Sequence, residues 1–183
     1  MSLSPEQRKY YKKAIEALIF CAGKAIKIGE LSKIMRELST SEILELIEEL
    51  RKDYEDRGIR ITEVAGGFRA ESAPEVAEIL RSYLGPKNFR WSKALLETLA
   101  IIAYYQPVTR TEISAMRGGV EVGPLLKVLL ERGFIRVVGK KQVPGRPALY
   151  GTTGFFLEYF GLKSLEELPP LRELERIVGK EDI

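Results

Sequence analysis

Four cations stand in and beside one loop near the carboxyl-terminal end of the sequence. Arg136, Lys140, Lys141 and Arg146 lie within the stretch 131–153, which reads ERGFIRVVGKKQVPGRPALYGTT. Guanidinium and ammonium groups on one loop are suited to contact phosphates, and such contacts hold a protein on nucleic acid without reading its sequence. The alternative is a solvated loop that binds nothing.

The elements around this loop indicate how it is presented. A helix is expected to end at Arg132-Gly133, because glycine readily takes the left-handed cap conformation. Residues 134–138 predict a short apolar strand, and residues 148–150 predict a second one. A helix followed by a hairpin with a long basic loop is typical of a winged helix. Domains of this kind usually bind nucleic acid or dock onto a protein.

Catalytic side chains are scarce. The sequence contains no histidine, which removes the commonest general base and metal ligand, and one cysteine, Cys21, which we expect to be packed rather than nucleophilic. No phosphate-binding glycine loop, nucleophile elbow or paired-cysteine motif occurs. Carboxylate pairs such as Glu48-Glu49 fit solvated helix faces, so a hydrolase using carboxylates alone is the weakest interpretation. We expect no enzyme, no cofactor and no metal site.

Length and composition describe an ordinary globular chain. Its 183 residues, of which 45% are hydrophobic and 30% charged, are enough for two small domains. The most apolar stretch, 94–105, contains Glu97 and is too short to span a bilayer. The first residues lack the apolar segment of a secretion signal. We therefore expect a cytoplasmic protein without a membrane partner.

One arrangement occurs twice along the chain. A stripe of apolar residues at helical spacing in 11–22 returns in 95–103, and each stripe precedes a shorter and a longer helix. The first copy then predicts two strands joined by Ala65-Gly66-Gly67, a tight-turn sequence. The predicted fold class is therefore mainly α with small β-hairpins (α+β), arranged as two tandem winged-helix domains.

The proposed division follows from this repeat. We place the first domain at 1–85 and the second at 86–162, because proline and glycine in Gly85-Pro86-Lys87-Asn88 interrupt the helical pattern. Residues 163–183 form a tail that we expect to be partly flexible. Leu171, Leu174 and Ile177 have the spacing of a docking helix, whereas Pro169-Pro170 and the charged end favour a loosely held segment.

Helix starts agree with this division. Five sites fit the capping box, in which a Ser or Thr and a Glu or Gln three residues later bond each other's backbone N–H groups. These sites are Ser4 with Gln7, Ser39 with Glu42, Ser72 with Glu75, Thr109 with Glu112, and Ser164 with Glu167.

The two copies differ in net charge, and the charges on their third helices do not favour sequence-specific binding to DNA. The net charge is −1 over 1–85, +7 over 86–152 and −3 over 153–183. A DNA-binding winged helix offers cations or amides from its third helix to base edges. The first copy's third helix, within 41–56, is strongly acidic, and the second copy's, within 124–132, is mainly apolar. A DNA-binding transcription regulator is therefore the alternative, and DNA contact is expected to be weak and nonspecific at most.

Aromatic residues in the first helix predict a contact between two copies of the chain. Tyr10, Tyr11 and Phe20 add apolar surface to a helix whose opposite face already fills a small core. Large exposed apolar patches usually mark interfaces, so we expect a homodimer contact here. The alternative is that these rings complete the domain's own core.

Longer runs of the sequence resemble a known family. The segments LETLAIIAYYQPVTRTEI, LLERGFI, PGRPALYGTT and FLEYFGLKSLEELP closely resemble segregation and condensation protein B (ScpB). EALIFCAGKAIKIGELSKIM and GGFRAES resemble the amino-terminal half of that family more loosely. Together these runs cover about residues 10–170.

The resemblance implies a role without catalysis. Members of the family are accessory subunits of the SMC–kleisin complex, which condenses and segregates chromosomes and acts on the nucleoid. They form dimers largely through the first domain, bind the kleisin subunit ScpA, and reach the SMC ATPase through it. We expect residues 88–168 to bind the kleisin, unless their apolar helices are consumed by the domain's own core. The candidate contacts are Leu95, Leu99, Lys127, Leu130, Arg146 and Tyr150.

Overall fold

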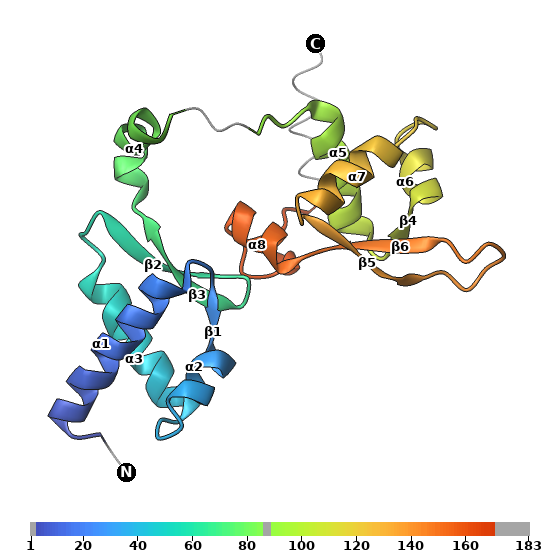
Figure 1. Cartoon of the computed structure of the whole chain (residues 1–183). Coiled ribbons are helices and arrows are strands. Elements are labelled where there is room, and N and C mark those ends of the chain that lie inside the picture. Colours follow the sequence, from blue (N-terminus) through green and yellow to red (C-terminus); the bar gives the residue numbers. More distant parts are fainter. Residues whose placement is uncertain (1–2, 86–88, 171–183) are drawn as a thin grey trace.

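Two small α+β domains follow each other along the chain (Figure 1). The computed structural model describes residues 3–85 and 89–170. Both domains have the order helix, short strand, helix, helix and two-stranded hairpin. In both, the short strand pairs with the last strand of the hairpin to give a three-stranded antiparallel sheet. This repeated topology confirms the expected pair of winged-helix domains.

Over residues 3–85 the first domain contains four α-helices, a short 3-10 turn and one three-stranded sheet. The sheet order is β1-β3-β2. The elements are α1 (Pro5–Ala22), β1 (Ile26–Lys27), α2 (Ile28–Ile34), α3 (Thr40–Asp53), β2 (Ile59–Val64), β3 (Gly67–Ser72), the 3-10 turn Pro74–Val76 and α4 (Ala77–Leu84).

The first hairpin closes with the turn that its sequence predicts. Ala65 and Gly66 both have positive φ, 53° and 69°, as two-residue turns matching the strand twist require. Gly67 then pairs with Lys27 across the sheet. A Cβ atom at Gly67 would lie 2.6 Å from the carbonyl oxygen of Ile26, so only glycine allows the strands this close.

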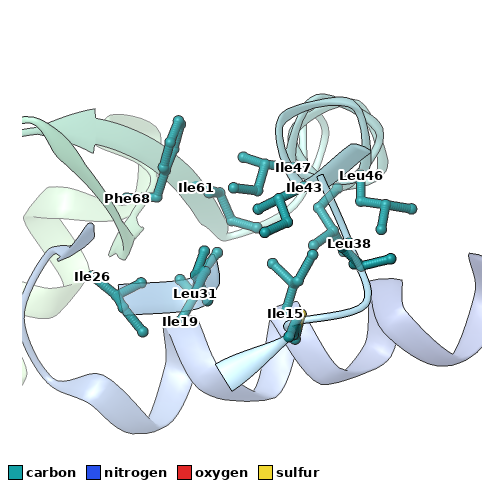
Figure 2. Close-up of a cluster of buried hydrophobic side chains, with 12 residues drawn as sticks. Ile15, Ile19, Ile26, Leu31, Leu38, Ile43, Leu46, Ile47, Ile61 and Phe68 are labelled. Carbon is teal, nitrogen blue, oxygen red and sulfur yellow. The ribbon is translucent and has the colours of Figure 1, made fainter. Parts of the chain in front are cut away.

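The first core lies between α1, α2, α3 and the inner face of the sheet (Figure 2). Ile15 and Ile19 of α1 meet Leu31 of α2, while α3 contributes one face of four buried residues at helical spacing. Phe68 and Ile61 close the core from the sheet. The buried face of α3 consists of Ile43, Leu46, Ile47 and Leu50.

The second domain repeats this plan, and helix α8 follows its hairpin as α4 follows the first one. Its sheet order is β4-β6-β5, with an irregular register between Val137 and Gly139. The elements are α5 (Lys93–Tyr105), β4 (Val108–Thr109), α6 (Arg110–Met116), α7 (Gly123–Glu131), β5 (Ile135–Lys140), β6 (Ala148–Thr152), α8 (Gly154–Phe160) and the 3-10 turn Leu165–Glu167.

The second core draws on residues beyond the hairpin. Leu99 and Ile102 of α5 lie at its centre with Leu129 of α7, and Phe156 of α8 packs against them. Leu168 is half-buried against the same core. The domain boundaries stay a proposal, with the first domain at 1–85, the second at 86–162 and the tail at 163–183. Within the tail, residues 171–183 lie outside the described residues.

Three of the five predicted capping boxes are confirmed, those at Ser4, Ser39 and Thr109. The box at Ser72 is wrong, because Ser72 ends β3 and Glu75 instead pairs with Arg60 of β2. The box at Ser164 forms differently. The hydroxyl oxygen of Ser164 accepts a hydrogen bond from the backbone N–H of Glu166. The carboxylate of Glu167 accepts one from the backbone N–H of Lys163.

Two further expectations need correction. Cys21 is exposed, because the buried side of α1 passes through Ile15 and Ile19 and leaves Cys21 outside. Helix α3 ends at Asp53 rather than at Arg57, and a turn covers the residues up to Gly58.

The two domains meet at the hairpin turn of the first. The backbone N–H of Ala65 donates to the carbonyl oxygen of Leu162 at 2.8 Å. Lys163 pairs with Glu63 of β2, with 3.0 Å between Nζ and the carboxylate. Figure 1 shows α8 beside this hairpin.

The capping box of α6 predicts a pH-dependent stability. Hydrogen bonds from Lys141 and from Thr109 lower the pKa of Glu112 to about 2, below its value in an unfolded chain. The charged carboxylate therefore stabilises the fold fully above about pH 4.5, and this contribution is lost as the pH falls toward 2. The Tm difference between the native chain and Glu112→Gln, followed by circular dichroism, should be largest near pH 7 and shrink below pH 4.5.

Glu166→Gln provides the control for this experiment. It also removes one glutamate, but its side chain forms no ion pair with any residue that the structure describes. A Tm difference for Glu112→Gln that stays constant from pH 7 to pH 3 would contradict the assigned role of Glu112.

Candidate functional site

The outward face of α1 carries the largest exposed rings of the first helix. Tyr10 is 68% exposed and Phe20 is 73% exposed. Tyr10, Lys13, Ala17 and Phe20 follow one another at helical spacing on the side opposite Ile15 and Ile19. We call these four residues the α1 outer face. An apolar surface of this kind, interrupted by one lysine, resembles the seam of a helix-packing interface.

Grooves flank the α1 outer face on both sides, and Ala17 lies in the wall of each. One groove, of about 780 Å³, lies toward α2 and includes Tyr10, Tyr11 and Ile34. The other, of about 360 Å³, lies toward the sheet and includes Phe20. A small residue between two grooves lets a second helix approach closely.

Tyr11 is less exposed than the other two predicted interface aromatics, Tyr10 and Phe20. It is half-buried against the first core, and its hydroxyl donates a hydrogen bond to Glu37. This bond raises the pKa of the Tyr11 phenol. Its ring meets that of Tyr10 edge to face, with 5.4 Å between centroids. Tyr11 therefore supports Tyr10 from the core side, and the contact between two copies stays a prediction.

The outward face of α3 is acidic, and it is partly tied to α1. Arg8 donates to Glu49 at 2.8 Å, and Lys12 pairs with Asp53 at 2.7 Å. The hydrogen bond and charge of Arg8 lower the pKa of Glu49, so this carboxylate stays ionised. In DNA-binding winged helices the corresponding helix enters the major groove. Here it would bring carboxylates toward phosphates, which is unfavourable.

The candidate partner contacts in the second domain separate into buried and exposed sets. Leu95 and Leu99 are 4% and 2% exposed, because α5 is the central helix of the second core. These two side chains are part of the second core, so they are not available to contact a partner directly. Leu130 and Lys127 lie on the open side of α7, where Lys127 approaches Glu131 at 3.8 Å. The other two candidates lie in the hairpin.

Tyr150 and Arg146 occupy different depths of that hairpin. Tyr150 pairs with Val108 of β4 and is half-buried against the second core. Arg146 is exposed at the far turn, where it has a φ of 38° and its N–H donates to the carbonyl oxygen of Val143. The structure thus does not gather the six candidates into one patch.

The predicted phosphate contacts lie along the hairpin that projects from the second domain (Figure 1). Arg136, Lys140 and Lys141 are all exposed. Lys141 bonds to Glu112 of α6, so its charge is already compensated. Across residues 3–85 and 89–170, Arg136, Lys140 and Arg146 have no carboxylate within ion-pair distance. Three uncompensated cations therefore remain on the hairpin.

An aromatic cluster that the sequence did not predict lies at the base of this hairpin. Phe134 meets Trp91, Phe155 and Tyr159 at centroid distances of 4.9–5.0 Å. Trp91 donates from Nε1 to the hydroxyl oxygen of Tyr159 at 3.0 Å. The rings come from the start of the domain, the hairpin and α8, so no local pattern could have revealed the cluster. It fixes α8 against the hairpin.

Gln106 is a second structural residue that the sequence did not reveal. Its amide oxygen accepts from the backbone N–H of Thr152 at 2.8 Å, and its amide nitrogen donates to Thr152 Oγ1. This pairing holds the end of α5 against β6. Its only sequence signal is an amide just before a proline.

Neither a metal centre nor a membrane-spanning helix occurs in the part of the chain that the structure describes. Residues 3–85 and 89–170 contain no group of three or more Cys, Asp or Glu side chains able to hold a metal ion. Among the same residues no helix is long and apolar enough to cross a bilayer.

Comparison with known proteins gives a family. The model of segregation and condensation complex subunit ScpB matches residues 13–171. Segregation and condensation protein B of Moorella thermoacetica is 47% identical over 163 residues, covering 88% of this chain and 83% of that one. The protein B homolog of Coxiella burnetii is 45% identical over 166 residues, covering 89% and 79% of the two chains.

Solved structures are also similar to this chain. A conserved hypothetical protein from Chlorobium tepidum shares 40% sequence identity at a TM-score of 0.43, covering 87% of this chain and all of that one. The structure of ScpB from Mycobacterium tuberculosis shares 29% identity at a TM-score of 0.40, covering 88% and 99%. On the family match and the curated relatives, the chain belongs to the family of segregation and condensation complex subunit ScpB.

Proposed function

We propose that this chain is a non-enzymatic, dimeric adaptor of the SMC–kleisin complex in chromosome condensation and segregation. It binds the kleisin subunit ScpA and reaches the SMC ATPase through that subunit. This role places it in the cytoplasm at the nucleoid. Family membership supports the process, and the name of the family describes a complex subunit rather than a catalyst.

The helices that would read DNA in a regulator carry the wrong side chains for that role. The face of α3 is acidic, and the open side of α7 presents Leu130 rather than a row of cations or amides. A winged-helix transcription regulator needs the opposite arrangement. These surfaces suit protein docking, which favours the adaptor over the regulator.

Dimerisation is proposed to use the α1 outer face, with Tyr10 and Phe20 as its apolar anchors. Both rings are more than two-thirds exposed in the single chain, and the flanking grooves can receive side chains of a second copy. Aromatic anchors that enter pockets usually provide most of the energy of an interface.

The kleisin is proposed to bind the second domain through its exposed side chains. Residues 86–152 have a net charge of +7, so a segment with acidic flanks would be steered toward this domain. Leu130 offers an apolar contact on α7 beside the charge of Lys127, and Arg146 supplies a separate exposed charge at the far turn of the hairpin. Leu95 and Leu99 contribute by holding α5 and α7 in place. An amphipathic helix lying on such a surface is a common mode of recognition.

Substitution of Phe20 tests the dimer. Phe20→Glu should shift the full chain from dimer to monomer in light scattering at micromolar concentration, because a buried unpaired carboxylate disrupts an interface. Val143→Glu is the matched control, since it places the same charge on an exposed apolar residue of the second domain. A Phe20→Glu chain that stays dimeric would contradict the proposed interface.

Substitution of Leu130 tests the kleisin surface. Leu130→Asp should weaken binding of the cognate kleisin's central region by at least about tenfold in calorimetry, because it removes apolar burial and desolvates a charge. Val138→Asp, at a similarly exposed position on β5, is the control. Equal affinities of Leu130→Asp and the native chain would overturn this placement. Binding confined to a 1–85 fragment would move the site to the first domain.

Neutralising the hairpin tests the contact with DNA. Weak binding that does not depend on sequence is expected, with an affinity that falls steeply with salt. Lys140→Gln with Arg146→Gln should reduce the slope of log affinity against log salt by up to about 2, since each phosphate contact contributes about 0.9. Fluorescence anisotropy with a labelled duplex measures this slope.

The control for the DNA experiment is Lys9→Gln with Lys33→Gln in the first domain, which makes the same change in net charge. A slope that changes equally in both pairs would assign the effect to overall charge. Tight preference for one duplex over scrambled competitors would support the regulator instead.

A further inference from the structure

Helix α4 follows the hairpin of the first domain, and its apolar face is uncovered in the part of the chain that the structure describes. None of its eight residues is buried. Ile79, Tyr83 and Leu84 are 70%, 85% and 74% exposed, and they share one face with half-buried Leu80. Figure 1 shows α4 standing apart from α1 and α3. The helix therefore presents a nearly complete apolar face to solvent.

A helix of this length needs an apolar partner. Isolated helices shorter than about 12 residues are marginal in water, and packing of an apolar face provides most of the stability of helices in proteins. Among the described residues, no side chain caps the start of α4 at Val76. We therefore expect a further apolar surface to cover this face in the assembled protein.

A suitable surface lies on the same domain, between α1 and the sheet. Two grooves of about 360 and 260 Å³ adjoin there, and Phe20 and Ile59 lie in the walls of both. We call them together the Phe20 groove. Ile59 is 43% exposed, so the groove offers apolar surface beside the α1 outer face. Within residues 3–85 and 89–170, the large apolar side chains that are more than two-thirds exposed lie only on α1 and α4, namely Tyr10, Phe20, Ile79, Tyr83 and Leu84.

Charges beside the two surfaces are complementary. Arg81 flanks the apolar face of α4, one turn before Leu84. Glu16 lies in the wall of the Phe20 groove, where it accepts a hydrogen bond from the hydroxyl of Tyr54. Neither Arg81 nor Glu16 forms an ion pair with a residue that the structure describes. An arginine at the edge of the helix can therefore meet a carboxylate in the groove.

The size of the proposed dimer contact leaves room for a second one. A stable interface usually buries about 800 Å² and about 20 residues on each partner. The α1 outer face, with its four residues, is far smaller than that. The eight residues of α4 and the walls of the Phe20 groove supply additional apolar surface next to it.

We propose that α4 of one copy packs into the Phe20 groove of a second copy, with Tyr83 against Phe20 and Arg81 facing Glu16. The proposal rests on the dimer proposed above and adds a second contact to it. Because a two-fold dimer uses the same surface of both copies, the exchange is reciprocal and covers both helices and both grooves. Any other partner of α4 would leave the Phe20 groove open.

Substitution on α4 tests this contact in the full chain. Tyr83→Glu should raise the Kd of the dimer at least about tenfold in sedimentation equilibrium, because it places an unpaired carboxylate in an apolar contact. Ser82→Glu is the matched control, since it adds the same charge to the polar side of the same helix and should leave the Kd unchanged. A native chain that is monomeric would contradict the dimer itself and this contact with it. A dimeric native chain whose Kd does not change on Tyr83→Glu would overturn the α4 contact alone.

A mixing experiment separates the exchange of α4 from other contacts. Tyr83→Glu chains keep an intact Phe20 groove, and Phe20→Glu chains keep an intact α4. Their heterodimer therefore retains one of the two contacts, whereas each homodimer retains neither. The mixture should be dimeric at a concentration at which each variant alone is monomeric, and a mixture that stays monomeric would overturn the reciprocal exchange. Tyr83→Glu chains that keep the native dimer Kd but lose kleisin binding would also overturn it, and would assign α4 to the kleisin.

Discussion

The architecture of both domains depends on one short strand pairing. Directly after the first helix, two residues pair with the last strand of the hairpin, Ile26 with Phe68 in the first domain and Val108 with Tyr150 in the second. This pairing closes the sheet on the helices, and the next helix starts at once. In the second domain the same corner contains Thr109, whose capping partner Glu112 also bonds to Lys141 of the hairpin.

Because the closed sheet and the helices bury their inner faces in the cores, only the outer surfaces of each domain are available for binding. The cores use nearly all the large side chains that point inward, so what distinguishes the domains is charge and shape outside. In the first domain, the outer face of α1 carries exposed rings and the outward face of α3 is acidic. In the second, the hairpin carries cations that no described carboxylate compensates, and an apolar groove adjoins α8. Such surfaces fit the role of a complex subunit that the family name describes.

Much of the fold could be predicted from local patterns. The sequence correctly predicted three capping boxes and one tight turn, because each depends only on neighbours in the chain. These are the boxes at Ser4, Ser39 and Thr109 and the turn at Ala65-Gly66. The predicted capping box at Ser72 does not form, and Glu75 instead pairs with Arg60, which is distant in sequence. The prediction that Cys21 is packed was wrong for a related reason. Helical spacing identifies the apolar face of a helix, but it does not say how much of that face is buried.

The sequence by itself determined the repeat, the hairpins, the charge difference between the domains and the family. The repeat, the hairpins and the charge difference follow from periodicity, turn chemistry and composition, which are local or additive properties, whereas the family follows from the resemblance of longer runs of the sequence. Only the tertiary structure decided that Leu95 and Leu99 are core residues, that Phe134 joins rings from three segments, and that Leu162 and Leu168, past α8, line a groove beside α5. The reason is physical, because burial depends on which distant element covers a side chain, and spacing along one helix does not specify that element.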